Sequence, residues 1–374
     1  MLVQGVYIAP PQIDYMKKYF TLLCLLTVFS TLKAQYVGLN KAEISRLKAY
    51  LKTDATTSNI YTAYLNDANK ALSERPNPRD TIVSEGHLKG DPNKTASALA
   101  MKDYRKVYAL SLAYNVEGKK EYLDKAIEYL KAWATVNHPT GNPINDTKLD
   151  YVMMGYDMIR SNVSESDRQI IDNWLVVIAE KELLKGTKGK ATVFNNWHSH
   201  RLKVVGQIGF ILNDKKFTDY ATIGIEKQVE TNLNPDGSTY DFLQRDALHY
   251  HLYDLEPLTT LAIIIKRATG VNEFMYVSPS GTSIKKSTDW LLPYVTGEKT
   301  HEEYVNSKVA FDKARADNHE QGFQIGHLFQ PEKALYLLSL ASYFDSNYTT
   351  IINQLKKRDS DVSEWQLVLN KIMK

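Results

Sequence analysis

The stretch that decides the fold class runs from residue 96 to residue 136 and reads ASALAMKDYRKVYALSLAYNVEGKKEYLDKAIEYLKAWATV. Its apolar residues recur every three or four positions on both sides of Gly118, a spacing typical of amphipathic helices. Residues 96–116 and 121–136 therefore predict two helices joined by a short polar turn. Such a pair forms an antiparallel helical hairpin, in which the two apolar faces pack together.

The same periodicity extends along most of the chain and predicts an all-α fold. One helix is expected to end near Glu74 and another to begin near Ser164, where serines and acidic residues form a capping cluster. Strand-like alternation is weak, and a short hairpin is expected only at 273–285. Further helices are predicted at 42–51, 149–159, 196–212, 216–231, 239–267, 284–296, 332–345 and 361–373.

Short polar turns between these helices, as at 212–216, favour stacked antiparallel hairpins. Such hairpins can continue as a solenoid or close into an α/α toroid. No strict sequence period is present, so a regular repeat array is not supported. No domain boundary is evident within residues 35–374, which predicts a single domain. Two polar stretches, 75–95 and 137–147, are expected to be ordered loops with functional roles.

Composition excludes several classes of function. The 374 residues include 46 Lys and Arg against 43 Asp and Glu, a net charge of +3, with no long basic run. Nucleic-acid binding therefore has no compositional support. Only 18 glycines and 12 prolines are present, which fits neither a disordered nor a fibrous chain.

The N-terminal segment has the pattern of a secretory signal peptide. Met16-Lys17-Lys18 precedes a mostly apolar run from Tyr19 to Thr31, and Leu32-Lys33-Ala34 follows before Gln35. We expect cleavage after Ala34, with residues 1–15 lying upstream of the true start. The apolar run is short for a membrane span, so the mature chain is expected to have none. The signal-peptide pattern predicts that this chain is exported, periplasmic or secreted. The single cysteine, Cys24, lies within this segment, so no disulfide is expected.

The first polar cluster with chemical potential is Asn195-Asn196-Trp197-His198-Ser199-His200-Arg201, at the start of the helix predicted at 196–212. Side chains and free N–H groups at a helix N-terminus favour anions. Asn196 could simply cap the helix, but two histidines and two amides exceed what a cap requires. Zinc binding is disfavoured because the pair is His-x-His without cysteine, and no H-E-x-x-H spacing occurs.

The second cluster follows an Asn-Pro-Asp-Gly turn at 234–237 and runs from Gln244 to Tyr253. On a continuous helix, Arg245, His249 and Tyr253 share a face at successive i,i+4 steps, and Tyr250 lies three residues before Tyr253. Such a polar face is expected to line a site or to form a hydrogen-bonded seam between helices. Unpaired buried polar groups would cost about 1–3 kcal/mol each.

The two clusters together suit the β-elimination of a uronate. Removing the C5 hydrogen builds negative charge on the sugar carboxylate, which preorganised donors such as Asn, His or Arg must neutralise. A base must take the C5 hydrogen, and an acid must protonate the O4 leaving group. Tyrosine and histidine can fill both roles.

At these residues the chain resembles the alginate lyase superfamily. The resemblance lies in Asn195-Asn196-Trp197-His198-Ser199, in Pro235-Asp236-Gly237 and in Ala247-Leu248-His249-Tyr250-His251-Leu252-Tyr253. An early hairpin from Asp103-Tyr104 to Trp133-Ala134 adds to it, and the likeness spans roughly residues 96–265. It implies an incomplete (α/α) toroid of antiparallel helical hairpins and a metal-independent, cofactor-free lyase. Its expected substrate is an anionic polysaccharide, alginate or polyglucuronate.

The resemblance also implies roles for individual residues. Tyr253 matches the tyrosine that acts as acid and often as base, while Asn196 and His198 match the neutralising amide and the histidine that aids proton abstraction. Trp197 separates Asn196 from His198, so His200 is an alternative for the histidine role. Arg245 is the expected carboxylate partner, one residue before the position that the family's arginine occupies. Tyr250 stays as an alternative tyrosine. Expected substrate contacts are Asn195, Trp197, His249, Arg105 and Lys102.

Two other hypotheses remain open from the sequence. A glycoside hydrolase on an α/α toroid would need two opposed carboxylates, and Asp236, Asp241, Asp246, Asp254 and Glu256 are candidates. A non-catalytic oligouronate-binding protein would use the same clusters without turnover. The polar stretch 315–330, which contains His319 and His327, is expected to be a surface loop, with a substrate-facing loop as the alternative. The sequence does not determine the uronate epimer, endo or exo action, or the oligomeric state.

Overall fold

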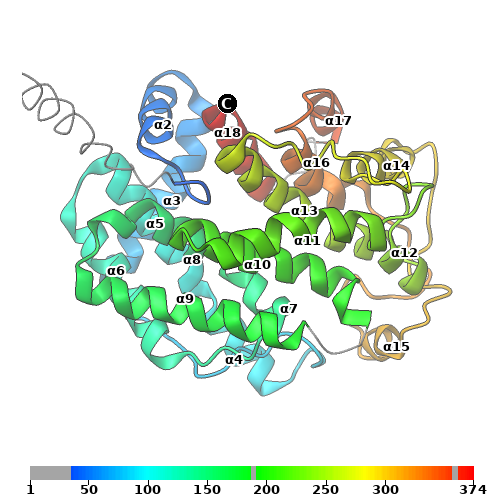
Figure 1. The fold of residues 1–374 in the computed structure, drawn as a ribbon, viewed down its shortest axis with the longest axis horizontal. Helices are drawn as coiled ribbons and strands as arrows, with labels where there is room; N and C mark the ends of the chain where they lie inside the picture. Colours follow the sequence, from blue (N-terminus) through cyan, green and yellow to red (C-terminus); the bar gives the residue numbers. More distant parts are fainter. Residues whose placement is uncertain (1–34, 187–190, 356–360) are drawn as a thin grey trace, which may run out of the picture. The chain divides into compact units, whose positions relative to one another are not determined.

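The computed structural model describes residues 35–186, 191–355 and 361–374, which belong to one compact unit, Gln35–Lys374 (Figure 1). The predicted signal peptide and its upstream residues lie outside the described residues. Beyond two isolated bridges, the described part of the chain contains no β structure. The prediction of an all-α fold is therefore confirmed.

The described helices, in chain order, are α2 (Lys41–Thr53), α3 (Ala55–Ser73), α4 (Pro92–Ala100), α5 (Lys102–Glu117), α6 (Lys120–Val136), α7 (Pro143–Asp146), α8 (Asp150–Ile159), α9 (Glu165–Lys185), α10 (Asn196–Leu212), α11 (Lys215–Asn232), α12 (Tyr240–Arg245), α13 (Leu248–Thr269), α14 (Ile284–Thr296), α15 (Ala310–Asp317), α16 (Leu335–Ala341), α17 (Tyr348–Leu355) and α18 (Asp361–Met373). Short 3-10 turns join some of them: η1 (Thr147–Leu149), η2 (Arg160–Asn162), η3 (Ala191–Val193) and η4 (Pro331–Ala334).

The helices pack as successive antiparallel hairpins of an incomplete (α/α) toroid. α5 packs against α6 and α8, α9 packs against α6 and α10, and α10 packs against both α11 and α13 (Figure 1). α13 then contacts α16, and α18 packs against α16 as well as against the N-terminal α2 and α3. The C-terminal helix thus connects the last hairpins to the first.

Helix α10 is buried along almost its whole length and belongs to both halves of the core. Its Val204, Val205 and Ile208 join the apolar cluster of the N-terminal half, while Leu202 joins that of the C-terminal half. The charged side chains that α10 buries are paired, Arg201 with Glu182 and Lys203 with Asp150. The N-terminal ends of α10 and α13, which carry both polar clusters, are therefore held by rigid central elements.

Two predicted helices are interrupted in the structure. The helix expected at 96–116 is divided at Met101, where α4 ends and α5 begins. The helix expected at 239–267 is divided between Arg245 and Leu248. The strand hairpin expected at 273–285 was wrong. Residues 273–283 form a loop closed by a turn in which the Ser278 N–H donates to the Thr282 carbonyl at 2.9 Å, and α14 begins at Ile284.

The break between α12 and α13 is centred on Asp246, which has a left-handed backbone conformation with φ 48°. Aspartate tolerates this region better than most residues because its short side chain bonds to nearby backbone. Here the carboxylate accepts hydrogen bonds from the N–H and side-chain amide of Asn306, at 2.8 and 2.9 Å. The Asp246 carbonyl also accepts from the Tyr304 N–H at 2.6 Å. A loop distant in sequence therefore stabilises the break.

The N-terminus of α13 is capped by Glu303, which comes from the same distant loop. Its carboxylate accepts hydrogen bonds from the backbone N–H groups of Leu248 and His249, at 2.7 and 3.1 Å. No local side chain caps this helix. A negative charge at a helix N-terminus is also favoured by the helix dipole. Glu303 therefore fixes the start of the helix that carries His249, Tyr250 and Tyr253.

Replacing Glu303 with alanine is expected to lower the free energy of unfolding by about 1–3 kcal/mol, because two buried N–H groups lose their acceptor. Urea denaturation followed by circular dichroism measures the change. The exposed neighbour Glu302 offers a matched control, and Glu302→Ala is expected to unfold as the unmodified protein does. Equal midpoints for the two variants would contradict the capping role.

Among the described residues, no helix combines the length and the apolar character that crossing a membrane requires.

Candidate functional site

Three adjoining cavities form a cleft at the N-terminal ends of α10 and α13. Their volumes are about 600, 330 and 220 Å³. Tyr253 lines all three, and each cavity shares a further residue with a neighbour: His249, Lys148 or Glu256. The three cavities therefore form one cleft with Tyr253 at its centre.

One face of α13 supplies much of the cleft wall. His249, Tyr253 and Glu256 follow one another at i,i+4 and i,i+3 spacing, which places them on the same side of the helix. The rings of His249 and Tyr253 are almost parallel, at 8° with centroids 6.1 Å apart. Arg245 does not share this face as predicted, because it belongs to the separate helix α12. It nevertheless lines the second cavity beside His249 and Tyr253.

The Tyr253 phenol lies among charged groups. The Nζ atom of Lys148 lies 6.0 Å from the centre of its ring. Burial raises the pKa of Tyr253 above its ordinary value, with further contributions from Glu85 and Glu256. The phenol is therefore protonated at neutral pH and is suited to donate a proton.

His200 packs directly against Tyr253, with ring centroids 4.3 Å apart. It is 4% exposed, its Nδ1 lies 2.9 Å from the Thr147 hydroxyl, and its Nε2 is buried. Pro257, four residues after Tyr253, has no N–H to donate to the Tyr253 carbonyl, so that carbonyl is free for another donor. His200 therefore positions Tyr253.

The structure places His198, predicted to aid proton abstraction, on a different side of α10 from Trp197. Its ring faces α11, 6.3 Å from the ring of Tyr220, and it does not line the three cavities. Burial, together with the charges of Arg201 and Lys227, lowers the pKa of His198 to about 4. Residues 197 and 198 are separated by about 100° around the helix, so Trp197 faces the cleft and His198 faces away.

Asn196 lines the second cavity and is held in place by a buried carboxylate. Asp241 accepts hydrogen bonds from the Asn196 N–H at 2.8 Å and from its side-chain amide, and also from the Asn232 amide at 3.0 Å. Burial raises the pKa of Asp241. By contrast, Asn195 accepts a hydrogen bond from the Trp197 N–H at 3.0 Å and caps α10. Asn195 lines none of the three cavities, and its substrate contact stays a prediction.

Two arginines approach Tyr250. The Arg245 guanidinium lies 3.8 Å above the centre of its ring and pairs with Asp312 at 2.6 Å. Arg315 donates a hydrogen bond to the Tyr250 hydroxyl at 2.8 Å. Burial raises the pKa of Tyr250, which is 5% exposed. Tyr250 lines only the second cavity whereas Tyr253 lines all three, so Tyr253 is better placed for proton transfer.

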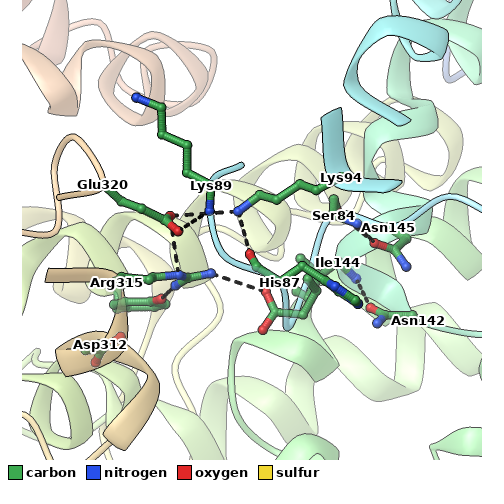
Figure 2. Close-up of polar contacts among 12 residues, drawn as sticks. Ser84, His87, Lys89, Lys94, Asn142, Ile144, Asn145, Asp312, Arg315 and Glu320 are labelled. Carbon is green, nitrogen blue, oxygen red and sulfur yellow. Dashed lines mark hydrogen bonds and ion pairs between the residues drawn. The ribbon is translucent and has the colours of Figure 1, made fainter. Parts of the chain in front are cut away.

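Two loops distant in sequence meet beside the second cavity. The Glu320 carboxylate accepts a hydrogen bond from the Lys89 N–H at 2.6 Å and lies 3.8 Å from Lys94 Nζ (Figure 2). Arg315 lies 3.6 Å from the carboxylate of Glu85. Lys94 also donates to the His87 carbonyl at 2.7 Å. The loop predicted at 75–95 is thus fastened to the segment at 315–330.

The 315–330 segment is part of the cleft rather than an independent surface loop. Phe323 and the neighbouring Gln324 and His327 line the first cavity, and Phe323 also lines the second. Arg315 lies at the end of α15 and not in a loop. This segment therefore contributes residues that the sequence patterns did not select.

Cations outnumber anions around the cleft. The basic side chains that line it are Lys94, Lys148, Lys203, Arg245, Arg315 and Lys333. The acidic ones are Glu85, Asp150 and Glu256. Burial and the neighbouring Lys203 lower the pKa of Lys148, and burial raises the pKa of Glu256 to about 7. Such a concentration of positive charge favours a polyanionic ligand even though the whole chain is nearly neutral.

Two predicted substrate contacts lie outside this cleft. Arg105 pairs with Asp67 at 2.7 Å, and its guanidinium lies over the ring of Tyr64. Lys102 is exposed at the first turn of α5. Neither residue lines any of the three cavities. Their position on one helix predicted a basic face that contacts substrate. In the structure that face is turned toward α3 and solvent.

Among the described residues, no group of three or more His, Cys, Asp and Glu side chains is arranged to hold a metal ion.

Comparisons with known proteins give a family and a set of similar structures. The model of the alginate lyase family matches residues 48–301. A crystal structure of an alginate lyase from Bacteroides ovatus is similar, with a TM-score of 0.64 at 16% identity, covering 90% of this chain and 98% of that one. None of the curated proteins matches the chain.

Alginate lyase A1-III from Sphingomonas species A1 is also similar. Its TM-score is 0.59 at 18% identity, covering 85% of this chain and 90% of that one. A tyrosine-to-phenylalanine variant of A1-III, in complex with a tetrasaccharide, has a TM-score of 0.55 at 19% identity, covering 72% and 80% of the two chains. These likenesses confirm the toroid fold.

Proposed function

Because the chain belongs to the alginate lyase family and is thus a polysaccharide lyase, we propose that it cleaves 1,4-linked polyuronates, alginate or polyglucuronate, by β-elimination. Each cleavage leaves a C4=C5 double bond on the new non-reducing end. The observation that carries this proposal is the position of Tyr253, a protonated phenol at the centre of a cation-lined cleft.

The cleft residues divide the chemistry between them. The uronate carboxylate is neutralised by the Asn196 amide together with Arg245 and Arg315, which line the same cavity. Donors fixed before the reaction stabilise the charge that develops on the carboxylate when the C5 hydrogen leaves. Tyr253 protonates O4 as the C4–O4 bond breaks. Lys148, beside the phenol, favours the phenolate that forms.

The substrate class rests on charge and on the similar structures. Six basic side chains along the cleft suit successive carboxylates of a polyuronate. The A1-III variant bound to a tetrasaccharide supports an oligosaccharide in this type of cleft. We further propose that the chain acts after export, as the pattern of its first 34 residues indicates.

The hydrolase hypothesis loses most of its candidate acids. Asp236 forms a turn with Ser238, and Asp241 holds Asn196. Asp246 stabilises the break before α13, and Asp254 is fully buried and accepts from the Ser199 hydroxyl at 2.6 Å. Of the five carboxylates, Glu256 alone lines the cleft. The geometry therefore favours elimination.

Ultraviolet absorbance of the C4=C5 double bond tests the proposal on polymannuronate, polyguluronate, polyglucuronate and a glycosaminoglycan. Absorbance that grows on at least one of the first three polymers is the expected result. New reducing ends without this absorbance would support hydrolysis instead. Binding of oligouronates without either product would support a non-catalytic protein.

A further inference from the structure

Four histidines lie at or near the cleft, and their environments differ. His327 lines the first cavity, but its Nδ1 faces the Gln324 carbonyl and its Nε2 is buried. His198 faces α11, away from the cavities. His200 touches the third cavity, but its nitrogens face the Thr147 hydroxyl and the protein interior. His249 is only partly buried and lines both the first and the second cavity. Of the four, His249 alone can present a ring nitrogen to a bound sugar.

The position of His249 relative to Tyr253 is suited to paired proton transfer. Both side chains project from one face of α13, one helical turn apart, with nearly parallel rings. Tyr250 and Phe323 contact the His249 ring at their edges, with centroids 5.0 and 5.5 Å away. These contacts hold the His249 ring in place. Among the described residues, none forms a hydrogen bond with its ring nitrogens. The lone pair therefore remains available to substrate.

The environments of the two groups push their protonation states apart. Burial, with the charges of Lys333, Arg315, Arg245 and His327, lowers the pKa of His249 to about 3, so the imidazole is neutral. Burial raises the pKa of Tyr253, so the phenol is protonated. Two neighbouring titratable groups separated in this way are typical of an acid and a base with distinct roles.

We propose, on the basis of the lyase function above, that His249 is the base that removes the C5 hydrogen while Tyr253 protonates O4 from the same side of the sugar. The His249 nitrogen forms a bond to the C5 proton, and the C5–H electron pair becomes the second bond of C4=C5. The C4–O4 bond breaks with its electron pair on O4, which takes the Tyr253 proton. An imidazolium and a phenolate remain, and return of one proton from His249 to Tyr253 restores both.

A base and an acid on one helix face act on the same face of the sugar ring, which defines a syn elimination. In 1,4-linked mannuronate and glucuronate the C5 hydrogen and O4 have this gauche, same-side relation. In guluronate the C5 hydrogen and O4 are antiperiplanar, so the base and the acid must approach from opposite sides of the ring. The assignment of His249 therefore selects mannuronate or glucuronate polymers over polyguluronate as substrate.

Two substitutions of His249 test the assignment on the polymer that the unmodified enzyme cleaves. Both His249→Ala and His249→Gln are expected to lower kcat at saturating substrate by about 10²-fold, the usual contribution of a general base. Glutamine keeps the size and polarity of the side chain but has no basic nitrogen.

Added imidazole is expected to raise the rate of His249→Ala in proportion to its concentration, and to leave Tyr253→Phe inactive. His138→Ala, an exposed histidine paired with Asp80, serves as the matched control.

The outcomes separate this inference from the function on which it rests. If the unmodified enzyme makes no double bond on any polyuronate, the proposed function fails. If it makes the double bond and His249→Gln keeps the same kcat, the function stands and the role of His249 is overturned. Cleavage of polyguluronate as fast as polymannuronate would overturn the same-side assignment.

Discussion

Replacing Tyr253 with phenylalanine is expected to lower kcat by about 10³-fold or more, near the upper part of the range for general acid catalysis. The substitution removes only the hydroxyl that protonates O4. It leaves the packing of the ring against His200 and His249 intact. Initial rates of double-bond formation at saturating substrate measure the effect, and thermal unfolding checks that the fold is kept.

Two matched tyrosines make this result specific. Tyr276→Phe, at a partly exposed residue that lines none of the cleft cavities, is expected to leave kcat unchanged. Tyr250→Phe is expected to have a smaller effect than Tyr253→Phe, because Tyr250 is buried and lines only the second cavity whereas Tyr253 lines all three. An active Tyr253→Phe enzyme together with an inactive Tyr250→Phe enzyme would transfer the acid role to Tyr250.

Replacing Asn196 with alanine is expected to lower kcat by about 10²–10³-fold, the range observed when one donor of a charge-stabilising site is removed. The amide is fixed by Asp241 before substrate binds, so it stabilises the developing charge without reorganisation. The variant is expected to fold, because Asp241 keeps its bonds to the backbone N–H of residue 196 and to Asn232. Steady-state kinetics give kcat, and near-ultraviolet circular dichroism reports on the packing.

The exposed Asn347 provides the control for this variant, and Asn347→Ala is expected to match the unmodified enzyme. The division of the loss between kcat and KM is informative. A rise in KM with unchanged kcat would mean that Asn196 binds the ground state and transition state equally, which would contradict its proposed role.

The fold class was accessible from the sequence because helical periodicity is local. The hairpin of α5 and α6 was visible in residues 96–136, and α10 and α14 have the bounds that their patterns predicted. The break at Asp246 was not accessible, since its stabilising partners Asn306 and Glu303 lie far away in sequence. Local propensity alone favours one continuous helix through this segment.

The site was partly accessible for the same reason. Tyr253, Asn196, Trp197 and His249 were selected because each lies in a dense polar cluster at a helix start, and all four line the cleft. Adjacent residues on a helix point in different directions, so the cluster around His198 and His200 could not be assigned to one face before the neighbours of α10 were known.

The residues that sequence reasoning missed come from separate elements. Lys148 lies in η1, Arg315 at the end of α15, and Glu85 in the loop before α4. Each has an ordinary polar neighbourhood in the sequence and gains its role only when the toroid brings the loops together. Glu256 was a candidate only for hydrolysis, and the Pro257 that follows it could have ended the helix. The proline instead lies within α13 and frees the carbonyl of Tyr253.

The measurement that tests elimination most directly is the mass of the oligosaccharides released from polymannuronate or polyglucuronate by the unmodified enzyme. Elimination divides the chain without adding water, so one fragment of each cut carries a C4=C5 double bond and is lighter than a saturated oligouronate by one water molecule. Fragments of that mass are the predicted result. Saturated fragments at every new end would show that water had been added, and would contradict the lyase mechanism.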